Sequence, residues 1–204
     1  MGLKTERKSA TVSILNKSSK NILAVGISHK YSDVYKNSDT FTDIKTEQKS
    51  STSMNVDYNI GTFTSGKDWW LVTWVTDDGK GHITSPNNFR DIIDKLEGIS
   101  GQVIGPLVTL TAAGAAIATG GAATPAAIAA ATLFATVVIN VMTNNESTAG
   151  FKQHILREED SGENIIEIHD EKVVFKSRSG DSETVLTLIT VKKNKNGEYE
   201  LVKG

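Results

Sequence analysis

Residues 98–145 read GISGQVIGPLVTLTAAGAAIATGGAATPAAIAAATLFATVVINVMTNN, without one charged side chain in a chain that is 23% charged. Alanine and the aliphatic residues favour helix, and Gly120-Gly121 followed by Pro125 is typical of one helix ending and another beginning. The stretch therefore predicts two apolar helices joined as a hairpin. Such a hairpin has to be buried against the protein's own strands, against a second copy or in a membrane, and this choice decides the function.

Strand patterns flank the apolar stretch on both sides, in residues 9–85 and again in residues 150–203. Turn residues such as Asp78-Gly79 and Asn196-Gly197 separate the strands. We expect hairpins in series in the first set and a meander in the second. The expected strands are 10–15, 21–29, 54–58, 69–76 and 82–84, followed by 151–156, 164–169, 172–177, 184–191 and 199–202.

A further helix is predicted between the first strand set and the apolar hairpin. Ser85-Pro86 is typical of a helix start, and the apolar residues that follow recur at helical spacing. They are Phe89, Ile92, Ile93, Leu96 and Ile99. Because Gly98, Gly101 and Gly105-Pro106 disfavour a continuous helix, we expect three helical pieces in the insertion 86–145.

The strand at 69–76 indicates how the hairpin is housed. Trp69, Leu71 and Val75 point to one face of this strand, whereas Trp70, Val72 and Trp74 point to the other. Apolar residues on both faces indicate a strand that is covered on both sides. We therefore predict a single α+β domain over residues 1–204, a mostly antiparallel β-sandwich with an inserted Ala/Gly-rich apolar helical hairpin on one face of a sheet.

The overall composition limits the classes of partner and the compartment. The net charge is −2, and the one lysine-rich run at 192–195 is short, so we expect no nucleic-acid partner. The chain has no cysteine, which excludes disulfides and thiol chemistry. The first eight residues are charged where a signal peptide needs an apolar core, which predicts a cytoplasmic protein, with peripheral membrane attachment as a further option.

The hairpin is the first candidate for a functional surface. Its strongly apolar residues lie at its base, and its tip is built of Ala, Gly and Thr. A membrane-inserting hairpin needs an apolar tip, so the distribution favours a packed soluble hairpin or a helix-mediated oligomer over insertion. The candidate membrane or oligomer interface is Val103, Ile104, Leu107, Val108, Ile117, Ile128, Leu133, Phe134 and Val137.

Aromatic residues form the second candidate. A cluster at one end of a sandwich could stack on a sugar or sit against a lipid headgroup, although packing in the core is the more ordinary use. The candidate ligand-binding residues are Tyr31, Asp33, Tyr35, Lys67, Asp68, Trp69, Trp70 and Trp74.

Catalytic, nucleotide and metal chemistry find little support. Gly61–Lys67 matches part of a phosphate-binding loop, but Asp68 stands where Ser or Thr is needed and a strand follows where a helix is required. Glu167, His169 and Glu171 could hold a metal, yet charges on an exposed hairpin are commonplace. The four histidines have no zinc spacing, and no acid, base and nucleophile set is visible. We expect no cofactor, no metal and no enzymatic activity.

Four stretches resemble a known family. They are 27–35 (ISHKYSDVY), 66–74 (GKDWWLVTW), 87–94 (NNFRDIID) and 147–156 (STAGFKQHIL). Together they resemble the "up-regulated in Daf" domain family of small eukaryotic proteins, over residues 10–180. The resemblance implies an association with stress- or longevity-linked expression. It implies no activity and no catalytic residues.

The sequence therefore leaves two hypotheses of function. The first is a non-enzymatic interaction protein whose hairpin mediates self-assembly or membrane attachment, with pore formation or defence as one form of this role. The second is a soluble module that binds a glycan or a lipid headgroup through its aromatic residues, with the hairpin serving only as core.

Overall fold

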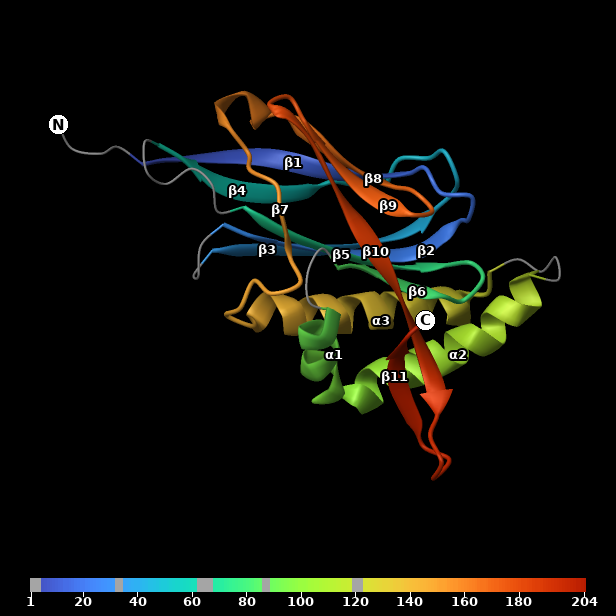
Figure 1. Ribbon diagram of the computed structural model, residues 1–204. Coiled ribbons are helices and arrows are strands. Elements are labelled where there is room, and N and C mark those ends of the chain that lie inside the picture. The colour runs from blue at the N-terminus through green and yellow to red at the C-terminus, as the bar shows by residue number, and fades with distance from the viewer. Residues whose placement is uncertain (1–4, 32–34, 62–67, 86–88, 119–122) are drawn as a thin grey trace.

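The computed structural model describes residues 5–31, 35–61, 68–85, 89–118 and 123–204, which form two stacked sheets and a layer of helices (Figure 1). Sheet A has the strand order β4-β1-β8-β9-β10, and sheet B has the order β3-β2-β5-β6-β10, with β7 beside β5 and β11 beside β10. The strands are β1 (Glu6–Asn16), β2 (Ile22–Lys30), β3 (Lys36–Ile44), β4 (Met54–Ile60), β5 (Trp69–Thr76), β6 (Gly81–Thr84), β7 (Lys152–Gln153), β8 (Glu163–Ile168), β9 (Lys172–Ser177), β10 (Gly180–Lys193) and β11 (Tyr199–Lys203).

The two sheets share β10 and close most of the way around a barrel. The first half of β10 pairs with β9 in sheet A, and residues 186–189 pair with β6 in sheet B. The described strands pair in antiparallel fashion except for β1 and β8, which are parallel. The expected α+β fold with a mostly antiparallel sandwich is confirmed.

The strand connections were only half predicted. Strands β8 to β11 form the expected meander. The expectation of hairpins in series in the first set is confirmed only in part. Strands β5 and β6 form the hairpin predicted at Asp78-Gly79, but β1 pairs with β4 and β8 and not with β2. Strand β3, which we did not predict, is an edge strand with the polar sequence KNSDTFTDI, in which only Phe41 and Ile44 are buried. Of the expected strand 151–156, only Lys152 and Gln153 form one.

The insertion forms three helices, as predicted: α1 (Phe89–Glu97), α2 (Ser100–Ala118) and α3 (Pro125–Asn144). The side chain of Thr124 caps α3 by accepting a hydrogen bond from the Ala127 amide at 3.1 Å, and Pro125 begins the helix. Of the predicted break positions, Gly98 is confirmed because it lies between α1 and α2, whereas α2 continues through Gly101, Gly105 and Pro106. Gln102, whose carbonyl loses its helical partner at Pro106, is exposed and can be solvated.

Strand β5 lies between two hydrophobic cores, as its sequence predicted. Its Trp70, Val72 and Trp74 enter the inter-sheet core, and its Leu71 and Val75 enter a helical core between sheet B and the helices. The inter-sheet core includes Val12, Ile27, Val56 and Phe175. The helical core includes Ile92, Leu107, Phe134 and Ile139.

The hairpin touches sheet B backbone to backbone at glycines. A methyl group built at Gly26 of β2 would lie 2.5 Å from Ile139 Cγ1 and 3.0 Å from the carbonyl oxygen of Ala135. A methyl group at Gly114 of α2 would lie under 3.0 Å from the carbonyl oxygen of Asp78, in the β5–β6 turn. Only glycine fits at these two points, so the protein's own β-domain takes up the hairpin.

Gly114→Ala tests this close approach, because its methyl group would meet the rigid backbone of the β5–β6 turn. We expect the free energy of unfolding to fall by about 1–3 kcal/mol, measured by urea unfolding with circular dichroism. Gly101→Ala is the matched control in the same helix, since its methyl group would meet nothing within 4 Å. It should leave stability unchanged or raise it by up to about 1 kcal/mol. Equal stability of the two variants would contradict the close contact between α2 and the β5–β6 turn.

Candidate functional site

The outward side of α2 and α3 carries no charged residue, since none occurs between Gly98 and Asn145. We call this surface the helical face. Its exposed members include Gln102, Thr109, Thr111, Ala112, Ala126, Ala129, Leu133 and Asn140. Leu133 is 52% exposed, which makes it one of the few large apolar side chains on the described surface. The face is therefore uncharged, largely small-residue and centred on one exposed leucine.

The predicted interface residues divide between core and surface. Val103, Leu107 and Phe134 are at most 2% exposed and belong to the helical core, so they are not available to a partner in this fold. Leu133 is exposed, and the remaining described members are partly buried, all but Val108 against the helical core. These are Ile104, Val108, Ile128 and Val137. The side chain of Ile117 lies outside the described residues.

The predicted ligand-binding residues do not form one site. Tyr31, Asp68 and Trp70 lie at one end of the sandwich, whereas Trp74 lies four residues further along β5, about 13 Å away. Trp70 and Trp74 are each 1% exposed, and Trp69 packs against the helical core. Asp33 and Lys67 lie outside the described residues.

At the Tyr31 end, charged side chains of β1 and β4 lie beside two tyrosines from the ends of β2 and β3. The rings of Tyr31 and Tyr35 stack at 5.0 Å, and the Arg7 guanidinium lies 5.4 Å from the Tyr35 ring centre. Arg7 also pairs with Asp57 at 2.5 Å. Hydrogen bonds from Ser9 and Arg7 lower the pKa of the Asp57 carboxyl. Of this group, Tyr35 alone is a strongly exposed ring, at 48%.

Asp68 and Trp70 fasten a segment of backbone. Residues 145–157, here called the strap, run from the end of α3 past sheet B to sheet A (Figure 1). The Asp68 carboxylate accepts hydrogen bonds from the Leu156 amide at 2.9 Å and from His29 Nε2 at 3.1 Å. The Trp70 indole donates to the carbonyl of His154 at 2.9 Å. These polar groups are engaged within the fold and are not presented to a ligand.

Lys30 binds the other end of the strap. The sequence pattern did not single out this residue. Its ammonium is buried and donates to the carbonyl oxygens of Met142 and Asn145 at 2.6 Å each and of Ser147 at 3.2 Å. It therefore caps the C-terminus of α3, where a positive charge is favourable. Burial, together with the positive charges of Lys36 and Lys95, lowers the pKa of Lys30 to about 8. A lysine at a strand end gave no sequence signal for this contact, which spans 112 positions or more.

A hollow of about 180 Å³ lies at the opposite end of the sandwich, where three turns meet. It is lined by Ser18, Ser19, Lys20, Trp74, Thr76, Asp78, Lys80, His82, His169 and Asp170. The rings of Trp74 and His82 stack nearly parallel, 5.1 Å apart. Burial lowers the pKa of His82 to about 4, although Asp78 and the carbonyl of Lys80 oppose this shift. The imidazole is therefore neutral at pH 7.

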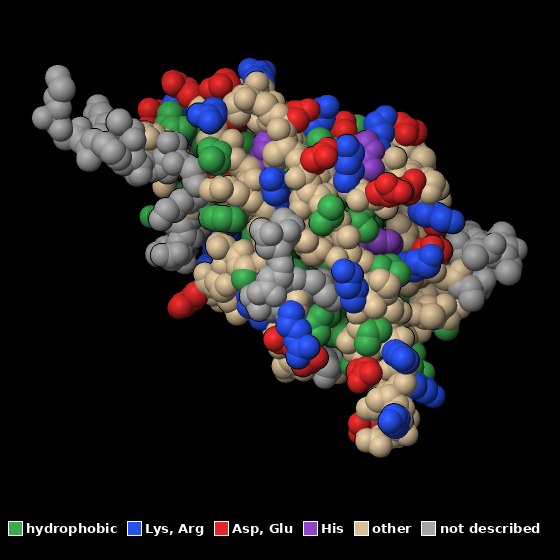
Figure 2. All heavy atoms as spheres, viewed as in Figure 1, with side chains coloured by type: hydrophobic (Ala, Val, Ile, Leu, Met, Phe, Trp, Pro, Cys, Tyr) green, Lys and Arg blue, Asp and Glu red, His purple; other side chains and the backbone are tan. Residues whose placement is uncertain are grey.

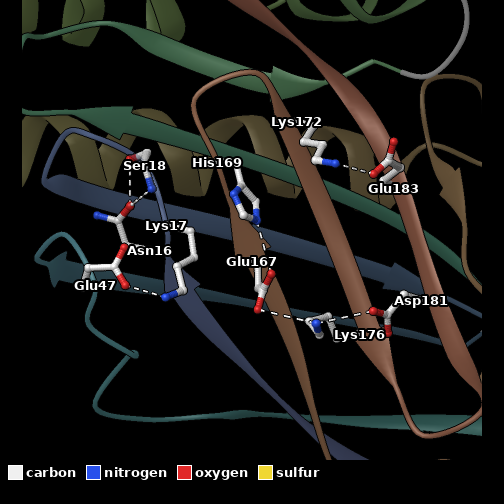
Figure 3. A network of polar contacts seen from close by, with 10 residues as sticks. All are labelled: Asn16, Lys17, Ser18, Glu47, Glu167, His169, Lys172, Lys176, Asp181 and Glu183. Atoms are coloured by element: carbon white, nitrogen blue, oxygen red, sulfur yellow. Dashed lines mark hydrogen bonds and ion pairs between the residues drawn. The ribbon is translucent and has the colours of Figure 1, made fainter.

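The outer face of sheet A carries alternating charges that satisfy one another (Figure 3). His169 Nε2 lies 3.2 Å from Glu167, and Lys176 lies 3.9 Å from Glu167 and 3.4 Å from Asp181. Within the described ranges, no three His, Asp or Glu side chains are placed to hold a metal. Figure 2 shows positive and negative side chains mixed over the upper part of the molecule, where β8 to β10 lie.

Positions 62–67 of the suggested phosphate-binding loop lie outside the described residues. One described helix, Pro125–Asn144, is long and apolar enough to cross a membrane, and 44% of its most apolar window is buried. This is weak evidence, because the core helix of a soluble protein has the same length and composition.

These features define a class of protein: an α+β sandwich that carries its own apolar helical hairpin on one sheet. The sequence model of the family described as "Up-Regulated in long-lived daf-2" matches residues 6–186. The chain belongs to this family, as the resemblance had indicated. The match ends within β10, so β11 lies beyond it. No curated protein matches the sequence.

Asp68→Ala tests the strap, because it leaves the Leu156 amide and His29 without their buried acceptor. We expect the free energy of unfolding to fall by at least about 1–3 kcal/mol. We also expect trypsin to cut faster in the strap, at Lys152 and Arg157. Asp181→Ala, which removes an exposed carboxylate, is the control and should change stability by less than about 0.5 kcal/mol. Unchanged cleavage in Asp68→Ala would show that the strap is held elsewhere.

The pKa of His82 predicts a pH dependence of stability. Because this pKa is about 4 in the folded protein and about 6.5 in the unfolded chain, the unfolded chain binds more protons below pH 6.5. Stability is therefore lost as the pH falls from 6.5 to 4. The groups around the ring are Asp78, Lys80, His169 and Asp170.

His82→Phe keeps a ring against Trp74 but cannot titrate, and urea unfolding at a series of pH values compares it with the parent protein. Between pH 7 and pH 4 the parent should lose about 1–3 kcal/mol more than the variant. Parallel stability curves would show that His82 does not contribute.

Proposed function

We propose that this protein is a non-enzymatic interaction protein that associates with a second copy of itself through the helical face. The observation that carries the proposal is the combination of no charge over 98–145 and a 52% exposed Leu133, with the part-exposed Val137 one turn further along the same face of α3. A partner covering this face desolvates no charged side chain. The small residues around Leu133, such as Ala129, allow a second helix to approach closely.

A second copy fits this face better than a membrane does. Membrane insertion of the hairpin would have to expose Leu107, Phe134 and the rest of the helical core, and it would have to break the backbone contact at Gly114. A second copy needs none of these changes, because it would use only the side chains that already face outward. Membrane attachment is therefore the competing outcome of the test.

The described side chains support no catalytic role. His154 Nδ1 lies 2.9 Å from Ser182 Oγ, which is the distance of a base and a nucleophile. His154 is buried, however, and its Nε2 has no hydrogen-bond partner in the described part of the chain, so no carboxylate orients the ring as in a catalytic triad. Burial also lowers the pKa of His154.

Light scattering coupled to size-exclusion chromatography, over a range of protein concentrations, tests the proposal with a matched pair of variants. Leu133→Glu places a charge in the helical face, whereas Val185→Glu places one on β10 at a side chain that is 59% exposed. We expect the parent protein and Val185→Glu to dimerise, and Leu133→Glu to stay monomeric with an unchanged midpoint of thermal unfolding.

Two results would contradict the proposal. One is a parent protein that is monomeric at every concentration. The other is flotation of the parent protein with mixed phosphatidylcholine and phosphatidylserine vesicles, abolished by Leu133→Glu, without self-association in their absence. The second result would assign the helical face to lipid.

A further inference from the structure

The end of β10 and the whole of β11 form a ribbon that leaves the rest of sheet B. Pairing of β10 with β6 ends at Ile189, whereas pairing of β10 with β11 runs from Ile189 to Lys193. In the described part of the chain, residues 190–199 therefore have no further strand beside them. The ribbon stands out from the body of the protein at the lower end of the view (Figures 1 and 2). The outer side of β11 is consequently an edge of sheet B.

The hydrogen bonds of the ribbon show which backbone groups of β11 face this edge. The Gly204 amide donates to the carbonyl of Leu188 across the ribbon at 3.0 Å. Even-numbered residues of the two strands therefore bond to one another, because the bonded pairs of an antiparallel ladder alternate. The N–H and C=O groups of Tyr199 and Leu201 point the opposite way, toward the edge. Tyr199 is 41% exposed, so another strand can reach it.

The other two sheet edges have outward amides that side chains of the fold occupy. These edges are β3 and β4. The Thr40 amide of β3 donates to the Asp39 carboxylate at 2.8 Å, and the Asp57 amide of β4 donates to a side-chain oxygen of β3 at 3.1 Å. Occupied amides cannot pair with a further strand, which is the hazard of an open edge. Within the described ranges, the outward amides of Tyr199 and Leu201 have no such acceptor.

The charges of the ribbon select the kind of strand that this edge accepts. The Lys193 ammonium lies 5.2 Å from the centre of the exposed Tyr199 ring. Lysine on an edge strand disfavours pairing between identical strands, so a second copy is a poor occupant. An acidic strand would instead be attracted. Lysines outnumber glutamates in the ribbon, whose charged residues are Lys192, Lys193, Lys195, Glu198, Glu200 and Lys203.

The helical side of β11 adds an apolar requirement. Leu201 is 6% exposed and belongs to the helical core, and the partly buried Ile99 packs against the same core. Every second residue of an added strand would face this side. We propose that the open edge of β11 binds an extended segment of a partner protein, with alternating acidic and apolar residues, as an additional strand of sheet B. This site lies outside the helical face and does not depend on self-association.

Amide hydrogen exchange followed by NMR tests this edge residue by residue. The probe is a synthetic peptide of alternating glutamate and valine, and a lysine–valine peptide of the same length is its control. We expect the amides of Tyr199 and Leu201 to exchange at least about tenfold more slowly with the acidic peptide than without it. The amide of Glu200, which faces β10, should change less. The same result is expected in Leu133→Glu, because that variant alters only the helical face.

Tyr199→Pro removes one outward amide without removing a bond to β10, and Tyr199→Ala, which keeps the amide, is the matched control. We expect Tyr199→Pro to weaken binding of the acidic peptide at least about tenfold, and Tyr199→Ala to weaken it less than about threefold.

Four results with the parent protein would overturn the proposal, whether or not the variants fold. The first is unchanged exchange with the acidic peptide, and the second is equal binding of the lysine peptide. The third is slow exchange of Tyr199 and Leu201 in the free protein, which would show that the fold already covers the edge. The fourth is slowing that depends on protein concentration and not on peptide, which would assign the edge to a second copy.

Discussion

The close approach of the helical hairpin to sheet B is the constraint on which the rest of the structure depends. Gly26 lets α3 lie directly on β2, and Gly114 lets α2 lie on the β5–β6 turn. This contact gives β5 a hydrophobic core on each face. It also turns an apolar insertion, which has the composition of a membrane hairpin, into the third layer of a compact fold, with only its outward side left to meet a partner.

Buried polar side chains fix the strap, the segment that leads from the helices back to the sheets. Lys30 caps the end of α3 and Asp68 binds the strap further along, so two strand ends of sheet B secure one crossing segment. Two of the predicted ligand-binding residues, Asp68 and Trp70, therefore bind the strap and are not available to a ligand. The stacked rings of Trp74 and His82 lie instead at the opposite end of the sandwich.

The surface is divided in a way that follows from the topology. Sheet A presents alternating charges that pair along and across β8 to β10, as His169, Glu167 and Lys176 do (Figure 3). The helical face on the other side of the molecule has no charge. Self-association through the helical face would leave the charged sheet in solvent.

The sequence by itself determined the local patterns: three helices in 86–145, most strands, and the two apolar faces of β5, because each depends on the spacing of neighbouring residues. It did not determine β3, whose polar residues suit an edge strand, or the pairing of β1 with β4 and β8. Only the tertiary structure separated Leu133 from the buried Phe134, and Trp74 from Tyr31. Contacts such as Lys30 with the end of α3 join residues more than 100 positions apart, and no local spacing encodes them.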